Sequence, residues 1–123
     1  DVTNAYMPDG PRHKKDVRLG SGPVISYSAT TSRAFTQTIV DTAKAQGVPY
    51  SVAGEPGATG TNAHVLQITR GGVPTALVSI PLRYMHTCAE VISADDAENT
   101  AALLRAFMEN FPAAYAEKEA AIC

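Results

Sequence analysis

The segment that most constrains the fold is PTALVSIP, residues 74–81, an apolar run with a proline at each end. A short run without a polar face indicates a strand that is buried on both sides. Prolines are typical of strand ends, because they lack the amide hydrogen that a sheet ladder needs. The run therefore predicts a buried strand, to which helices and further strands must add.

Patterns typical of strands and helices alternate along the rest of the chain. Residues 23–28 are rich in β-formers and predict a strand. In residues 33–46, apolar side chains recur every four positions, which indicates one buried face of a helix. Ser32 is in place to cap this helix and Gly47 to end it. The remaining expected elements are strands over 49–54 and 89–93, a helix over 63–70 capped by Thr61 or Asn62, and a helix that starts near the capping pair Ser93 and Asp96 and ends or kinks at Pro112.

This alternation predicts an α/β fold, a three-layer-like mixed sheet flanked by helices. With 123 residues, one domain over 1–123 is expected. A domain of this length buries roughly two thirds of its unfolded surface. Functional sites in such sheets gather where strand ends meet loops, so the end of the strand over 74–81 is the first place to look.

Composition excludes several classes of function. The net charge is −2, and no basic stripe exists beyond residues 12–15, so no nucleic-acid partner is expected. No apolar run approaches the roughly 20 residues that span a bilayer, so no membrane partner is expected. Cys88 and Cys123 lie at no paired spacing, which favours free thiols and a cytoplasmic location. The first residue is Asp1 rather than Met, which favours a piece of a longer protein.

A histidine follows the apolar strand. In SIPLRYMHTCAEV, residues 79–91, His86 precedes Glu90 by four positions. An imidazole needs a partner for each ring nitrogen, so the residues alone leave two roles open: a structural histidine bonded to the backbone, or a metal ligand. No HxxxH, HExxH or CxxC pair supplies further ligands nearby. The glycine-rich residues 54–63 lack the lysine of a phosphate-binding loop, and no nucleophile motif surrounds Cys88.

The segment GTNAHVLQITRGGVPTALVSIPLRYMHTCAEVISADD, residues 60–96, resembles the C-terminal catalytic segment of the glutamyl-aminopeptidase and tetrahedral-aminopeptidase family of di-metal peptidases, some of which carry endoglucanase labels. The likeness rests on the helix start at 60–63, the Gly-Gly-Val turn at 71–73 and the R-Y-M-H stretch at 83–86. The start DVTNA is similar to the family's segment at a metal-binding aspartate, so the likeness runs from Asp1 to about residue 107.

The resemblance implies that this chain is the C-terminal part of a zinc-peptidase-like catalytic domain. It implies that His86 is a ligand of one metal ion and Asp1 a ligand of a second. Two divalent ions, zinc or cobalt, would share a hydroxide and aim it at a peptide carbonyl. Glu90 either orients His86 or forms a surface salt bridge. The other residues expected around the ions or the substrate are Thr61, Asn62 and Arg83.

The sequence departs from the family pattern at three positions: Asn62 stands where Asp is expected, Asn4 where His is expected, and Cys88 where Pro is expected. The family's other ligands and its catalytic glutamate lie upstream of the matching segment, so no catalytic residue is expected within it. Two ligands cannot hold two ions, so the chain alone is expected to be inactive and to bind no metal. Its expected partners are a peptide substrate, the missing N-terminal part of the same polypeptide and, when intact, further copies of itself.

Two other functions remain open. The chain could be a binding or structural domain of the same fold without catalysis. It could also be a glycoside hydrolase, which needs two opposed carboxylates. Asp95 and Asp96 are the acidic pair available for that role, but their place at a helix start indicates capping instead.

Overall fold

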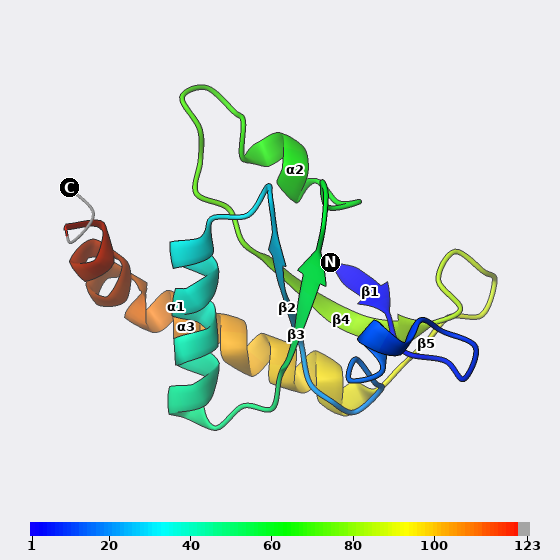
Figure 1. Ribbon diagram of the computed structural model, residues 1–123. Helices are drawn as coiled ribbons and strands as arrows, with labels where there is room; N and C mark the ends of the chain where they lie inside the picture. The colour runs from blue at the N-terminus through cyan, green and yellow to red at the C-terminus, as the bar shows by residue number, and fades with distance from the viewer. Residues whose placement is uncertain (121–123) are drawn as a thin grey trace.

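The computed structural model describes residues 1–120, with side chains through Phe111 (Figure 1). Five strands form the sheet, and three α-helices and a short 3-10 turn accompany them. The elements are β1 (Val2–Asn4), η1 (Arg12–Lys14), β2 (Val24–Ser28), α1 (Arg33–Gln46), β3 (Ser51–Glu55), α2 (Ala63–Leu66), β4 (Leu77–Arg83), β5 (Val91–Ile92) and α3 (Ala94–Ala120).

The sheet is mixed, as the sequence predicts. Its strand order is β1-β4-β2-β3, with β5 paired to β4. β1 runs parallel to β4 and β3 runs parallel to β2, whereas β2 and β5 each run antiparallel to β4. The apolar run identified in the sequence therefore forms the central strand, with strands paired along both edges. The expected burial on both faces is wrong, because the described helices cover one face and a pocket lined by Leu77 and Ser79 opens on the other.

The core lies on one face of this sheet. Ile25 of β2 is fully buried there against Ile39 of α1 and Leu103 of α3. The two helices also contact each other, and Phe35 and Phe107 meet edge to face with ring centroids 5.5 Å apart. Burying side chains of this kind contributes about 1.5–3 kcal/mol each. Both helices and the sheet are therefore held together through one apolar cluster.

Helix α1 follows its sequence signals closely. The Ser32 hydroxyl accepts a hydrogen bond from the amide of Phe35, 3.3 Å away, and caps the first turn. Gly47 ends the helix in the left-handed conformation, with φ of 65°. The predicted bounds over 33–46 are confirmed.

The bounds predicted for the central strand are wrong at both ends. β4 begins at Leu77 and continues to Arg83, so Pro81 lies inside it rather than at its end. The amide of Ile80 donates to Asp1 on the β1 side of the strand, so the position of Pro81 faces the other side. The pairing with β2 stops at Ser79 on that side, so the missing amide hydrogen of Pro81 costs no ladder bond.

Helix α2 is much shorter than the predicted helix over 63–70. It spans Ala63–Leu66, and Asn62 makes no side-chain cap bond. The Thr61 hydroxyl instead accepts from the amide of Ala63, 3.2 Å away. The segment from α2 to β4 projects from the body of the molecule (Figure 1), so little tertiary packing supports a longer helix.

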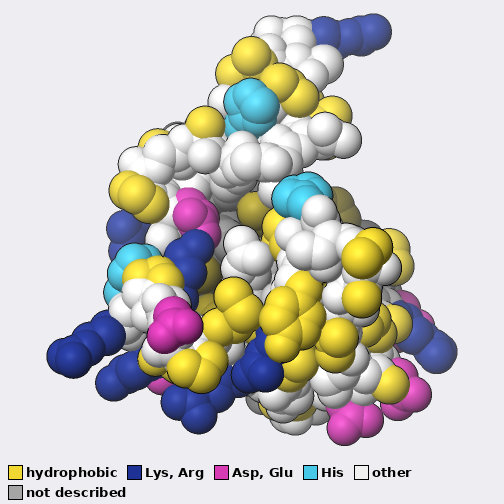
Figure 2. All heavy atoms as spheres, turned by 90° about the vertical axis from the view of Figure 1, so that its right-hand side faces the viewer, with side chains coloured by type: hydrophobic (Ala, Val, Ile, Leu, Met, Phe, Trp, Pro, Cys, Tyr) yellow, Lys and Arg dark blue, Asp and Glu magenta, His cyan; other side chains and the backbone are white. Residues whose placement is uncertain are grey.

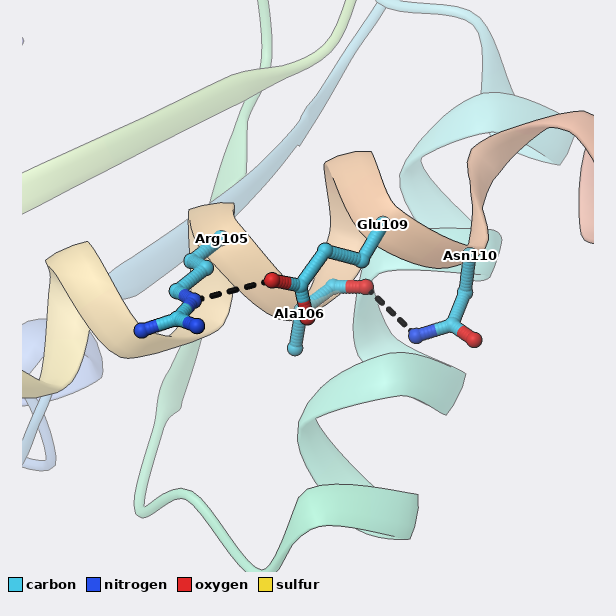
Figure 3. A network of polar contacts seen from close by, with 4 residues as sticks. All are labelled: Arg105, Ala106, Glu109 and Asn110. Atoms are coloured by element: carbon cyan, nitrogen blue, oxygen red, sulfur yellow. Dashed lines mark hydrogen bonds and ion pairs between the residues drawn. The ribbon is translucent and has the colours of Figure 1, made fainter.

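Helix α3 begins where predicted but does not end at Pro112. It continues to Ala120, and its last part turns away from the direction of its earlier turns (Figure 1). On its exposed side, the Arg105 Nε donates to Glu109 at 2.9 Å, and this contact raises the pKa of Arg105 (Figure 3). Asn110 donates to the carbonyl of Ala106 one turn earlier (Figure 3).

Asp96 does not act as a helix cap, contrary to the capping-box prediction. Its side chain is fully buried, and its two carboxylate oxygens accept hydrogen bonds from the amides of Gly20 and Gly22, each 2.7 Å away. This carboxylate joins the start of α3 to the loop before β2. Asp96 is therefore unavailable as one of two opposed carboxylates, which removes the basis for a glycoside hydrolase.

Within residues 1–120, no helix is long and apolar enough to cross a bilayer. Cys88 is exposed and unpaired, whereas Cys123 lies outside the described residues.

Candidate functional site

A pocket of about 210 Å³ opens on the sheet face that the helices do not cover. We call it the sheet pocket. Its walls come from β1, β2, β3 and β4, from residues 59–61 and from Met85. Figure 2 shows this side of the molecule, which is hollowed between the projecting upper part and the body. Segments far apart in the sequence therefore meet at one concavity.

Strand register explains why the floor of the sheet pocket is polar. Ile25 pairs with Val78, and both side chains face the helices. Because side chains alternate between faces, Ser26 and Ser79 must face the opposite side. Both serines line the pocket, and their residues are 3% and 1% exposed. Glu55 pairs with Ser28 at the ends of β3 and β2, so its side chain lies on the same face.

His86 lies in the loop that follows β4, directly after the pocket residue Met85. Its φ is 64° and that of Tyr84 is 63°, both in the left-handed region. For residues other than glycine, this conformation costs about 1–2 kcal/mol each. Two such residues within three positions indicate that the surrounding structure holds the loop in a specific shape, which is a frequent property of functional sites.

Glu90 fixes the backbone of this loop rather than the imidazole. Its carboxylate accepts a hydrogen bond from the amide of His86, 2.7 Å away. The imidazole is exposed, and neither ring nitrogen has a hydrogen-bond partner among the described residues. A structural histidine bonded to the backbone would show such partners, so the structure leaves both nitrogens available to a ligand.

Asp1, which directly precedes β1, lies on the pocket face of the sheet. Its backbone amine donates to the carbonyl of Val78 and its carbonyl accepts from Ile80, which places Asp1 opposite Ser79 in the parallel ladder. Residues opposite each other in a ladder point to the same face. The next residue, Val2, lines the sheet pocket, as does Met85 beside His86. Each of the two expected ligands is therefore the sequence neighbour of a residue that lines the pocket, although neither lines it itself.

These two donors do not form a complete metal site. The described residues contain no group of three or more His, Cys, Asp or Glu side chains able to hold an ion. A free imidazole and an exposed carboxylate are suitable donors for zinc or cobalt. Catalytic zinc sites need three protein ligands, so the donor set fits the expected ions in type but not in number.

The other expected site residues take different positions. Thr61 lines the sheet pocket, whereas Asn62 is exposed and outside its lining. Arg83 at the end of β4 donates weakly to the carbonyl of Tyr6, at 3.5 Å. The Nε of Arg83 is buried and has no partner among the described residues. Of these three, Thr61 alone lines the pocket.

Sequence reasoning missed Ser26, Ser79 and Glu55 as pocket residues. They lie on three different strands, and no short motif joins them. Glu55 also forms an ion pair with Lys14, with Nζ and Oε1 3.5 Å apart and both side chains about one third exposed. The strand order and register would have revealed the three together, because they determine which residues of neighbouring strands share a face.

Comparison with known proteins identifies what this chain is similar to. The profile of M42 glutamyl aminopeptidases matches residues 1–103. Among curated proteins, a lysyl aminopeptidase from Pyrococcus furiosus is 40% identical over 109 residues. That match covers 89% of this chain and 31% of the relative.

Two solved structures share the fold. The aminopeptidase APDkam598 from Desulfurococcus kamchatkensis superposes with a TM-score of 0.78 at 30% identity, over 87% of this chain and 32% of that one. PhTET1-12s, a dodecamer in its asymmetric unit, superposes with a TM-score of 0.68 at 25% identity, over 88% of this chain and 31% of that one. This chain thus spans about a third of the length of each of these three proteins.

Proposed function

This chain belongs to the M42 glutamyl aminopeptidase family, and from that membership we propose that it forms the C-terminal part of a catalytic domain that removes N-terminal residues from peptides. A longer polypeptide would supply the remainder of the domain. The short span relative to known family members supports this proposal. The availability of both ring nitrogens of His86, in a loop of strained backbone beside a pocket, is the observation that carries it.

We infer that His86 and Asp1 each supply a ligand to one of two divalent ions, zinc or cobalt. Such ions, when bound, acidify a water molecule and polarise the peptide carbonyl. The other residues of this chain hold the two proposed ligands in place. Glu90 holds the His86 backbone, and the β1–β4 ladder holds Asp1 at the pocket face. The remaining ligands and the general base would come from the longer polypeptide, so residues 1–123 alone would be inactive.

We further propose that the intact protein assembles with copies of itself in the cytoplasm. The dodecameric state of PhTET1-12s supports assembly. The exposed free thiol of Cys88 supports a reducing compartment, since oxidising compartments favour paired cysteines.

The experiment compares His86→Ala with His13→Ala in the intact polypeptide. His13 is also exposed, but it lies in the η1 turn and outside the sheet pocket lining, so it is a matched control. We expect His86→Ala to lower kcat/KM for peptide N-terminal hydrolysis at least 100-fold, because a lost ligand weakens the ion on which the reaction depends. His13→Ala should stay within twofold of the original protein.

Two outcomes would contradict the proposal. Full activity of His86→Ala would remove the ligand role. An intact polypeptide that releases no N-terminal residue from any peptide, at saturating zinc or cobalt, would instead indicate a binding or structural domain of this family. The absence of three clustered ligands among the described residues is compatible with that alternative, and this experiment separates the two.

A further inference from the structure

We propose that the sheet pocket receives the side chain of the peptide's N-terminal residue and selects a basic one through Glu55. This inference rests on the proposed function, since it needs a peptide whose first residue is held between His86 and Asp1. Val2 and Met85, the sequence neighbours of these two residues, line the sheet pocket. Its volume of about 210 Å³ is below the roughly 300–1,000 Å³ of pockets for whole drug-sized ligands, so it suits a single side chain.

The floor of the pocket favours a polar occupant. The residues Ser26 and Ser79 are more than nine-tenths buried, but their hydroxyls remain accessible from the pocket and have no hydrogen-bond partner among the described residues. An occupant that brings a hydrogen-bond donor satisfies these hydroxyls, whereas an apolar side chain leaves them unpaired. Sites built with polar groups reject analogues that lack the matching group.

The charge of the pocket favours a cation. Among the described residues that line it, Glu55 alone carries a formal charge. An acidic side chain entering the pocket would meet this carboxylate and be repelled, whereas an ammonium or guanidinium group would form a charge-assisted hydrogen bond with it.

Lys14, which lies outside the pocket lining, modulates the preference for a cation through its ion pair with Glu55. Its ammonium lies 3.5 Å from the Glu55 carboxylate, and both side chains are about one third exposed. Ion pairs with this much exposure are weak, so a substrate cation can share or displace Lys14. Lys14 does not line the sheet pocket, so its removal frees Glu55 without changing the pocket walls.

The test measures kcat/KM of the intact polypeptide for peptides that begin with lysine or with norleucine, which has the same carbon chain without the ammonium. We expect a preference for lysine that Glu55→Gln lowers at least tenfold, since hydrogen bonds to charged groups contribute about 1.5–3 kcal/mol. Lys14→Ala should raise the preference. Glu98→Gln, which changes an exposed carboxylate on α3, should leave it unchanged.

A lysine-over-norleucine preference in Glu55→Gln that stays within twofold of the original protein's would overturn the proposal. An equal loss of kcat/KM for both peptides would also overturn it, because Glu55 would then bind the α-amino group common to both. Binding is measured separately from catalysis, by titrating metal-free intact polypeptide with lysinamide and norleucinamide and following backbone amide NMR signals. Saturable shifts at Ser26, Glu55 and Ser79 with lysinamide alone support the pocket even if hydrolysis is never observed. No shift there, in a protein that does hydrolyse peptides, overturns the pocket and leaves the proposed function standing.

Discussion

At the residue scale, several side chains form hydrogen bonds that the neighbouring sequence does not predict. Asp96 resembles a helix cap in the sequence, but its carboxylate binds the amides of Gly20 and Gly22 across more than 70 positions. Glu90 was expected either to orient His86 or to form a surface salt bridge, and its carboxylate accepts a hydrogen bond from the backbone amide of His86. Residue type predicted that these groups need partners, but the partner depends on tertiary contacts that no local pattern encodes.

Gly22 provides a direct test of the loop that Asp96 holds. Its φ is +82°, and an added Cβ would lie 2.0 Å from the carbonyl oxygen of Pro49. We expect Gly22→Ala to lower the free energy of unfolding by more than about 3 kcal/mol, since backbone must shift in addition to the cost of the left-handed conformation. Gly20 has nearly the same φ, +84°, and nothing within 4 Å of the added atom. Gly20→Ala should therefore cost only about 1–2 kcal/mol.

Urea unfolding followed by circular dichroism measures both variants. Equal losses of unfolding free energy in the two variants would show that the close approach of Gly22 to Pro49 does not contribute to stability. The same titrations give the slope of the unfolding free energy against urea concentration, which should be the same in both variants if only stability has changed.

At the element scale, the sequence predicted best where the signal is local. The period of the apolar residues, the Ser32 cap and the Gly47 stop define α1 to the residue. The strands over 23–28 and 49–54 were also correct in place, with shifts of one or two positions. Helix 63–70 was wrong, because a helix that projects from the body lacks the packing that stabilises most helices.

The two predicted caps, Ser32 and Asn62, give a second prediction. We expect Ser32→Ala to lower the free energy of unfolding by about 1 kcal/mol, because the amide of Phe35 loses its acceptor. Asn62→Ala should change it by less than about 0.5 kcal/mol, since the Asn62 side chain makes no cap bond and is exposed. Thermal unfolding of both variants is the measurement, and a loss in Asn62→Ala as large as in Ser32→Ala would contradict it.

At the scale of the whole molecule, the family and the mixed α/β sheet followed from the sequence, whereas the sheet pocket did not. The R-Y-M-H stretch and the strand before it are local and specific, so they carried the family assignment. The pocket depends on the order β1-β4-β2-β3, which brings four separate segments to one face. No single segment contains that order.

The projecting segment between β3 and β4 exposes a group of apolar side chains, so we expect residues 1–123 to associate with a second copy at high concentration. Burial of such side chains on association is favourable, so a segment that exposes several of them is a candidate contact surface. Ile68→Lys should shift the association to higher concentration. Met108→Lys is the matched control, because Met108 and Ile68 are each 66% exposed but lie on different elements. The exposed apolar residues of the segment are Val65, Leu66, Ile68 and Val73.

Sedimentation velocity over a wide range of concentrations measures this association. A single monomeric species at every concentration would argue against any self-association through the segment. An equal shift in both variants would show that general surface charge, and not this segment, controls the association.

The ligand role of His86 is the claim on which the account depends most, and metal content tests it most directly. Mass spectrometry of the purified intact polypeptide, after dialysis against zinc or cobalt and removal of free ions, counts the ions bound per chain. We predict two ions in the original protein and in His13→Ala, and a loss of at least one in His86→Ala with the fold unchanged by circular dichroism. Two tightly bound ions in folded His86→Ala would contradict the account.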